Sequence, residues 1–250
     1  MKIYCTENYE AMSRKAAAIM AAQVIAKPDS ILGLATGSSP VGLYQNLAAG
    51  CAAGDLDFSK ITTVNLDEYA GLDGEHDQSY RYFMNNNLFY HINVDLAKTN
   101  VPNGKAPDPE AECRRYEQLL KDLGPADIQL LGMGRNGHIG FNEPDDVFVA
   151  DTHVVELTES TIDANARFFA SRDEVPKKAL TMGVGAIMRA KKILIVVSGA
   201  DKAEAVKASF AGPITPRVPA SILQLHPDVV LVGDKAALAG LLETGAEVCG

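Results

Sequence analysis

The sequence lacks several features that would point to a membrane, a nucleic acid or a secreted protein. Its most apolar runs, such as Lys192 to Ser198, are far too short to span a bilayer. The N-terminal residues contain no apolar signal segment. The chain has few positive charges: it contains 23 Lys and Arg residues and 32 Asp and Glu residues, which gives a formal net charge of −9. Such a chain repels phosphate backbones and anionic membranes, so we expect neither as a partner.

Cysteine is scarce and widely spaced. Cys5, Cys51, Cys113 and Cys249 form no CxxC pair, so a redox or zinc motif of that kind is excluded. Four reduced thiols are the expected state, which is typical of a cytoplasmic protein. The P-loop, GxGxxG and HExxH patterns are also absent. We therefore expect no nucleotide cofactor and no metal site.

What is present is an alternation of short apolar runs with longer amphipathic segments. The chain has 250 residues, 47% of them apolar, enough for the core of one large domain. Continuous apolar runs are typical of strands buried on both faces of a parallel sheet. The predicted strands are residues 1–5, 31–35, 61–66, 128–131, 193–197 and 229–232.

Helical spacing and capping residues mark the segments between these strands. The predicted helices are residues 8–27, 40–53, 110–123, 179–190, 202–210 and 235–242, with Ser39 as the expected cap of the second helix. The βαβα order predicts an α/β fold with a doubly wound, mostly parallel, Rossmann-like sheet and helices on both faces. We expect a single domain spanning residues 1–250.

Ligands of such sheets bind beyond the carboxyl ends of the strands, and three strand ends carry polar residues. The first is the turn formed by Thr36, Gly37, Ser38 and Ser39, which opens a helix. Backbone N–H groups, hydroxyls and the helix dipole make such a turn a candidate anion site. Taken alone, the pattern also fits an ordinary capped turn.

The second strand end carries two consecutive acids, Asp67 and Glu68. A carboxylate at this edge could move protons to and from carbon next to a carbonyl group. A helix cap or a solvated acid is the alternative interpretation of the pair.

The third strand end is the glycine loop, residues 132–144. Four glycines in nine residues allow a ligand to approach the backbone closely. His138 lies in this loop, between Asn136 and Glu143, and a His oriented by an amide and a carboxylate can act as a general acid and base. A lone loop His is otherwise an ordinary surface residue.

Together these segments carry a resemblance to a known family. The chain resembles the glucosamine-6-phosphate deaminases over nearly its whole length. The motifs are LATGSSP at 34–40, NLDEY at 65–69, GRNGHIGFNEP at 134–144, ARFF at 166–169 and LQLHP at 223–227. The resemblance implies a hydrolase of amino-sugar catabolism, active in N-acetylglucosamine degradation, that converts glucosamine 6-phosphate and water to fructose 6-phosphate and ammonia.

The resemblance also implies a role for each site residue. Asp67 is similar to the base that moves a proton between C2 and C1 of the open-chain sugar. His138 resembles the group that opens the sugar ring, and Glu143 the carboxylate that orients it. Asn136 stands where some family members have Asp, so it can orient His138 but brings no charge.

The implied phosphate site combines the turn at residues 36–39 with Arg167 and Lys202. Arg167 offers a forked donor and Lys202 a point charge, which would hold an anion on an acidic protein. The segment from about residue 163 to 178 carries Arg167 and is expected to form a lid over the phosphate.

One departure from the family concerns regulation. Some members are activated by an N-acetylated sugar phosphate bound by basic residues after the NEP motif. Here that stretch, residues 145–155, is rich in acids and apolar residues, so an anionic activator would meet repulsion. We expect no allosteric activator. A monomer is favoured, with a homo-oligomer as the alternative.

Two rival functions use the same features. A 6-phosphogluconolactonase would also need a phosphate site and a loop His, but lactone hydrolysis does not need Asp67 as a carbon base. A sugar-phosphate-sensing regulator without catalysis would need a DNA-binding module. Only about 30 residues precede the strand at residue 31, and the acidic charge disfavours DNA.

Overall fold

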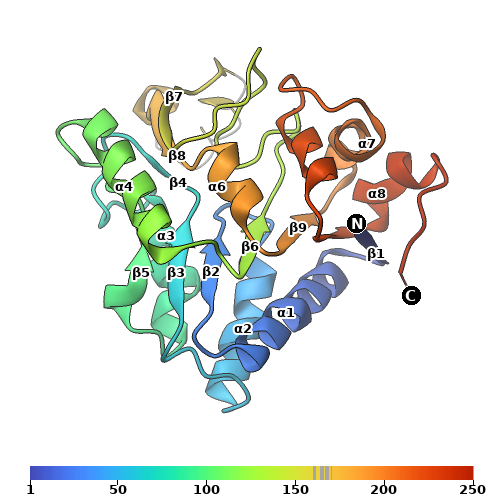
Figure 1. The fold of residues 1–250 in the computed structure, drawn as a ribbon, viewed down its shortest axis with the longest axis horizontal. Helices are drawn as coiled ribbons and strands as arrows, with labels where there is room; N and C mark the ends of the chain where they lie inside the picture. The colour runs from blue at the N-terminus through green and yellow to red at the C-terminus, as the bar shows by residue number, and fades with distance from the viewer. Residues whose placement is uncertain (160–161, 164–165, 167–168, 170, 250) are drawn as a thin grey trace.

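The computed structural model describes residues 1–159, 162–163, 166, 169 and 171–249 (Figure 1). Its strands are β1 (Lys2–Thr6), β2 (Ile31–Leu34), β3 (Thr62–Asn65), β4 (Asp67–Tyr69), β5 (Thr99–Asn100), β6 (Ile128–Leu131), β7 (His153–Glu156), β8 (Lys178–Thr181), β9 (Ile193–Val197) and β10 (Val229–Asp234). Its α-helices are α1 (Tyr9–Ala26), α2 (Val41–Ala52), α3 (Tyr80–Asn87), α4 (Pro109–Leu123), α6 (Val184–Arg189), α7 (Ala203–Ala211) and α8 (Lys235–Leu242). Short 3-10 turns, such as Ala200–Lys202 and Pro219–Leu225, connect several of them.

The larger sheet confirms the predicted fold class. In the described residues it has seven strands in the order β1-β10-β9-β6-β2-β3-β5, all paired in parallel. The six predicted strands are all present, and β5 is an addition at one edge. From β2 the chain first adds strands on one side and then returns to add β6 on the other. The switch in strand order therefore lies between β2 and β6.

The helices cover both faces of this sheet. Crossovers between parallel strands are right-handed, so the direction of each crossover decides its face. The connections through α1 and α2 run towards β5, whereas those through α4, α6 and α7 run back towards β1. Figure 1 shows α1 beside α2 and α7 beside α8, and both pairs are in contact. Every residue of β9 and β10 is buried, as their apolar sequences require.

A second, smaller sheet was not predicted. It is antiparallel, with the order β4-β8-β7, and Asp67 pairs with Thr181 across it. The prediction of a helix over residues 179–190 is therefore wrong in its first half. Residues 178–181 form β8, which pairs on both sides, and the helix α6 begins only at Val184.

Glycine explains the late start of α6. A β-carbon built on Gly183 would lie 2.3 Å from the carbonyl oxygen of Asp151 and 2.4 Å from that of Ala150. The N–H groups of Val184 and Gly185 donate to the carbonyls of Val149 and Ala150. The segment that leaves the glycine loop is therefore held directly against the first turn of α6.

The small sheet has its own apolar cluster, separate from the main core. Its buried members are Tyr69, Phe141, Leu157, Ile162, Val175 and Ala179. Val175 belongs to the predicted lid, and Arg172, also in that segment, forms ion pairs with Glu159 and Asp163. The lid itself remains a prediction, because Arg167 and several of its neighbours lie outside the described residues. The helices formed by the described residues include none long and apolar enough to cross a membrane.

We expect Gly183→Ala to destabilise the fold by about 1–3 kcal/mol, because the added methyl group meets rigid backbone oxygens. Gly240→Ala is the matched control. Gly240 lies inside α8, and its β-carbon would come no closer than 3.4 Å to the flexible Lys207 side chain. Denaturant unfolding would measure both free energies. A Gly183→Ala protein as stable as the parent would contradict the observed packing.

Candidate active site

The predicted site lies where the order of the parallel strands switches. The turn at residues 36–39 follows β2, and the glycine loop at 132–144 follows β6, its neighbour in the sheet. A β-carbon built on Gly132 would lie 4.0 Å from the Ser39 β-carbon, so the two segments approach each other. This is the position at which open α/β sheets bind their ligands.

Two tyrosine hydroxyls bind the backbone of this turn and of the residue before it. The Tyr44 hydroxyl donates to the Ala35 carbonyl at 2.6 Å, and the Tyr9 hydroxyl donates to the Ser38 carbonyl at 3.0 Å. Gly37 has a φ of 88°, a conformation that favours glycine. The expected Ser39 cap is wrong by one residue, because Pro40 occupies the cap position of α2 and no side chain caps the helix.

Asp67 is the first residue of β4 and only 5% exposed. Its Oδ1 atom finds no hydrogen-bond partner among the described residues. Burial, followed by the adjacent charge of Glu68, raises the pKa of the Asp67 carboxyl to about 8. A β-carbon built on Gly140 would lie 3.5 Å from Asp67 Oδ2, so the carboxyl contacts the glycine loop two residues after His138.

An aromatic cluster surrounds this carboxyl and was not predicted. The half-buried Tyr80 side chain extends to the Thr36 side chain, and its hydroxyl donates to the Tyr69 hydroxyl at 3.5 Å. The Tyr80 ring stacks on Phe141 of the glycine loop, with centroids 5.9 Å apart and an interplanar angle of 4°. Burial first, then Tyr69 and Asp67, raise the pKa of Tyr80 well above its ordinary value. Tyr80 thus links all three predicted strand-end segments.

The His138 ring lies over Gly134. A β-carbon built on Gly134 would lie 2.3 Å from His138 Cε1, so any larger residue would displace the ring. The loop closes through a hydrogen bond from the Gly134 N–H to the His138 carbonyl at 3.0 Å. Gly137, between them, has a φ of 82°. The glycine spacing seen in the sequence therefore fixes where the imidazole lies.

Glu143 contacts both of the other predicted polar residues of the loop. Its Oε1 lies 3.3 Å from His138 Nδ1, an ion-pair distance without the alignment of a hydrogen bond. Its Oε2 accepts from Asn136 Nδ2 at 2.6 Å. The Asn136 side-chain oxygen accepts from the His138 backbone N–H at 3.2 Å. Asn136 is therefore linked to the imidazole through Glu143 and through the His138 backbone.

The Glu143 side chain is 7% exposed, whereas that of His138 is 24% exposed. The carboxylate lies behind the ring, and the ring keeps access to solvent. This arrangement fits a proton carrier whose orientation is set from the protein side.

Of the two predicted phosphate-binding cations, Lys202 and Arg167, the structure describes only Lys202. Lys202 ends the turn after β9 and is half-buried at the start of α7. The neighbouring Asp201 pairs with Arg135 of the glycine loop at 2.6 Å, which brings this turn to the site. Arg167 lies outside the described residues.

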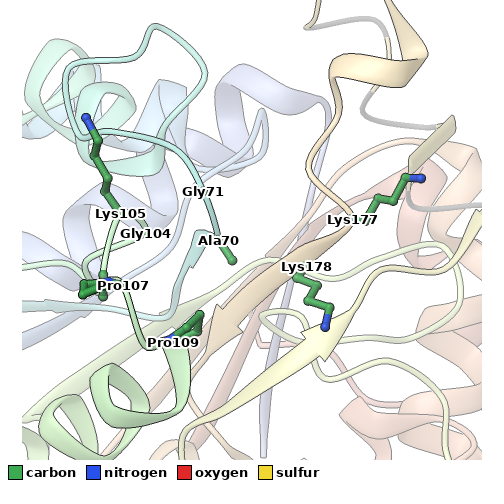
Figure 2. A pocket seen from close by; sticks show the side chains of 9 residues that line it. Ala70, Gly71, Gly104, Lys105, Pro107, Pro109, Lys177 and Lys178 are labelled. Atoms are coloured by element: carbon green, nitrogen blue, oxygen red, sulfur yellow. The ribbon is translucent and has the colours of Figure 1, made fainter.

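The structure also contains a cavity of about 430 Å³. It is lined by Ala70, Gly71, Gly104, Lys105, Ala106, Pro107, Pro109, Lys177 and Lys178. Figure 2 shows the side chains of Lys105 and Lys177 extending away from Ala70. None of the predicted site residues lines this cavity. Within the described part of the chain, no group of three or more His, Cys, Asp or Glu side chains could hold a metal ion.

Comparison with known proteins finds close relatives. A glucosamine-6-phosphate deaminase of Clostridium perfringens is 56% identical over 237 residues, 95% of this chain and 98% of its own length. One from Lachnoclostridium phytofermentans is 56% identical over 232 residues, 93% of this chain and 98% of its own. A solved structure described as a monomeric glucosamine-6-phosphate deaminase is 52% identical, with a TM-score of 0.94 over 96% of this chain and 100% of that one.

More distant structures share the fold alone. A 6-phosphogluconolactonase from Thermotoga maritima has a TM-score of 0.74 at 17% identity, over 94% of this chain and 99% of that one. The family model described as glucosamine-6-phosphate isomerases/6-phosphogluconolactonase matches residues 6–231. From the extent of that match and the identity to its close relatives, the chain belongs to this family of sugar-phosphate enzymes.

Proposed function

We propose that the chain is a glucosamine-6-phosphate deaminase, which converts glucosamine 6-phosphate and water to fructose 6-phosphate and ammonia. Relatives of that name, 52–56% identical over most of the chain, support it. The observation that carries the proposal is Asp67, a buried carboxyl in contact with the loop that presents His138. A carbon base and a ring-opening group on adjacent segments are what an amino-sugar isomerisation requires.

The proposed phosphate site is the turn at residues 36–39, with Arg167 and Lys202. Backbone N–H groups of the turn and the hydroxyls of Thr36, Ser38 and Ser39 would donate to phosphate oxygens at the start of α2. The half-buried Lys202 would add a positive charge from the neighbouring turn. Arg167 is included on the family resemblance.

Ring opening is assigned to His138. The imidazole would take the proton of the C1 hydroxyl and return a proton to the ring oxygen, which yields the open-chain aldehyde. Glu143, 3.3 Å from Nδ1, would orient the ring and stabilise its protonated form. Asn136 would hold the second oxygen of Glu143.

Isomerisation is assigned to Asp67. The carboxylate would remove the C2 proton of the open-chain sugar to give an enolamine, and then return a proton to C1. The carbon–nitrogen double bond formed at C2 would add water and release ammonia, which leaves the C2 ketone. A buried base with a raised pKa suits this step, because it binds the carbon proton more strongly than an exposed carboxylate does. The ammonium group of the substrate would favour the charged form of Asp67.

We also propose that the enzyme is a cytoplasmic monomer without an activator. The four free cysteines fit a reducing compartment. The solved relative at 52% identity is described as monomeric. After Pro144 the chain presents Asp145 and Asp146, and Asp146 is paired with Arg217. An anionic effector would find little positive charge there.

The first test is ammonia release from glucosamine 6-phosphate by the purified protein and by Asp67→Asn. We expect turnover by the parent and a fall of about 10²–10⁴-fold in the variant, because the amide cannot accept the C2 proton. Circular dichroism and competition by inorganic phosphate would show that the variant folds and still binds an anion. A parent that releases no ammonia but hydrolyses 6-phosphogluconolactone would refute the proposed function.

Lys202→Ala is expected to raise KM about tenfold with little change in kcat, since it removes a charged donor to the phosphate. Lys207→Ala is the matched control, because Lys207 is also half-buried and lies on the same helix, α7. Steady-state kinetics on both variants give the comparison. Equal KM values for Lys202→Ala and the parent would remove Lys202 from the phosphate site.

The rate is expected to depend hyperbolically on glucosamine 6-phosphate, with no increase on adding N-acetylglucosamine 6-phosphate. The physical reason is the acidic stretch after Pro144, which offers no cluster of cations to an effector. Initial rates with and without the effector test these kinetics, and sedimentation velocity tests the proposed monomer. A sigmoidal curve that the effector makes hyperbolic would contradict them.

A further inference from the structure

Glu68 is a buried carboxyl that the proposed mechanism does not use. It is 1% exposed and directly follows Asp67 in β4. Successive side chains of a strand point to opposite faces, so Glu68 lies on the side of β4 away from the Asp67 carboxyl. A carboxyl removed from water needs hydrogen bonds or a nearby charge to be retained.

Three backbone N–H groups meet this carboxyl. Glu68 Oε1 accepts from Tyr69 at 2.8 Å and from Tyr80 at 2.9 Å, and Oε2 accepts from Arg81 at 2.9 Å. Tyr80 and Arg81 are the first two residues of α3, where a carboxylate also interacts favourably with the helix dipole. Glu68 therefore fastens the start of α3 to the strand that carries Asp67.

This attachment determines the position of Tyr80. The Tyr80 side chain reaches Thr36 in the turn at residues 36–39 and stacks on Phe141 of the glycine loop. Because Glu68 holds the Tyr80 backbone, a shift of the Glu68 carboxylate would shift the aromatic ring that joins these two segments.

The attachment also places a negative charge behind Asp67. Among the described residues of other elements, the phenols of Tyr44 in α2, Tyr80 in α3 and Tyr116 in α4 are close enough to be affected by the charge of Asp67. Burial raises the pKa of each phenol, so all three stay neutral. Glu68 is the charged group that acts on Asp67.

A cation, Arg81, acts on Glu68 from the start of α3. The guanidinium of Arg81 donates to Thr99 Oγ1 at 2.7 Å and to the Thr99 carbonyl at 2.8 Å. Its charge and the three N–H donors favour the ionised form of Glu68, against the larger effect of burial, which raises the pKa of Glu68 to about 7. Because the two buried carboxyls are adjacent in the chain, they titrate as a coupled pair.

We propose that Glu68 is a positioning residue of the deaminase site, whose carboxylate holds Tyr80 against Thr36 and keeps a negative charge behind Asp67. This inference rests on the proposed role of Asp67 as the carbon base. A charge behind the base increases its affinity for the C2 proton, and the substrate ammonium compensates for that charge when the sugar is bound.

The test compares Glu68→Gln, which removes the charge, with Glu68→Asp, which keeps the charge but shortens the side chain. For Glu68→Gln we expect the acidic limb of the kcat/KM profile to move to lower pH by about one unit, because Asp67 then ionises more easily. For Glu68→Asp the limb stays in place. Both variants weaken inhibition by inorganic phosphate several-fold, because Tyr80 is released from Thr36.

Glu117→Gln is the matched control. Glu117 is also buried and accepts a backbone N–H, that of Thr152 at 3.0 Å, but it lies in α4 and joins it to the segment before β7. We expect it to lower the unfolding temperature without moving the pH limb or the phosphate inhibition constant. A Glu68→Gln profile that coincides with the parent profile would overturn the proposal while leaving the deaminase function standing. A parent without ammonia release would instead overturn the function.

A second measurement decides the matter if Glu68→Gln does not fold. Carboxyl carbon NMR follows Glu68 in the parent and in Asp67→Asn. In a coupled pair each carboxyl carbon senses both ionisations, so the Glu68 resonance is expected to show two inflections in the parent and only one once Asp67 is replaced by a neutral amide. A Glu68 titration unaffected by Asp67→Asn would overturn the proposal.

Discussion

A carboxyl group held out of water without a cation beside it is the feature on which this site depends. Burying a charged group in a protein is unfavourable unless another charge or several hydrogen bonds compensate it. Asp67 has neither from the described residues, so its proton remains bound to higher pH than usual. In the proposed mechanism, the substrate's ammonium group, next to the carbon to be deprotonated, would supply the missing positive charge. The same burial would thus strengthen Asp67 as a base and favour a positively charged substrate.

The small antiparallel sheet provides that burial. The larger sheet alone would leave the end of β3 open to solvent, as strand ends of open α/β sheets are. Strand β4 instead turns into a second layer, where Asp67 pairs with Thr181 and where Tyr69 and Phe141 join one apolar cluster. Thr181 also accepts the Phe141 N–H at 3.0 Å, which ties the glycine loop to the same sheet. The larger sheet positions the loops, and the smaller sheet excludes water from between them.

The sequence analysis predicted those elements that leave a pattern in neighbouring residues of the chain. The apolar runs of β9 and β10 are continuous because both faces of those strands are buried, and the glycines at 134 and 137 mark a loop that folds onto its own His. The small sheet escaped prediction because β4, with three residues, and β8 are stabilised only by pairing with distant segments. The roles of Glu68 and Tyr80 escaped for a related reason. An acid and a tyrosine reveal nothing of their burial until the chain is folded, and both depend on the start of α3, a helix that the sequence analysis did not predict.

The pairing of β1 with β10 has a consequence for synthesis of the chain. Residues Lys2 to Thr6 pair in register with residues 230–234, so β1 is synthesised long before its partner strand. The hydrogen bond from the Cys249 N–H to the Ile3 carbonyl extends this dependence further along the chain. Contacts of such long sequence separation form slowly because of the loop that must close. The nascent protein can assemble β2, β3, β5 and β6, with the turn and the glycine loop, while its first strand is still unpaired. That strand and the apolar face of α1 then need protection from aggregation until β10 has been synthesised.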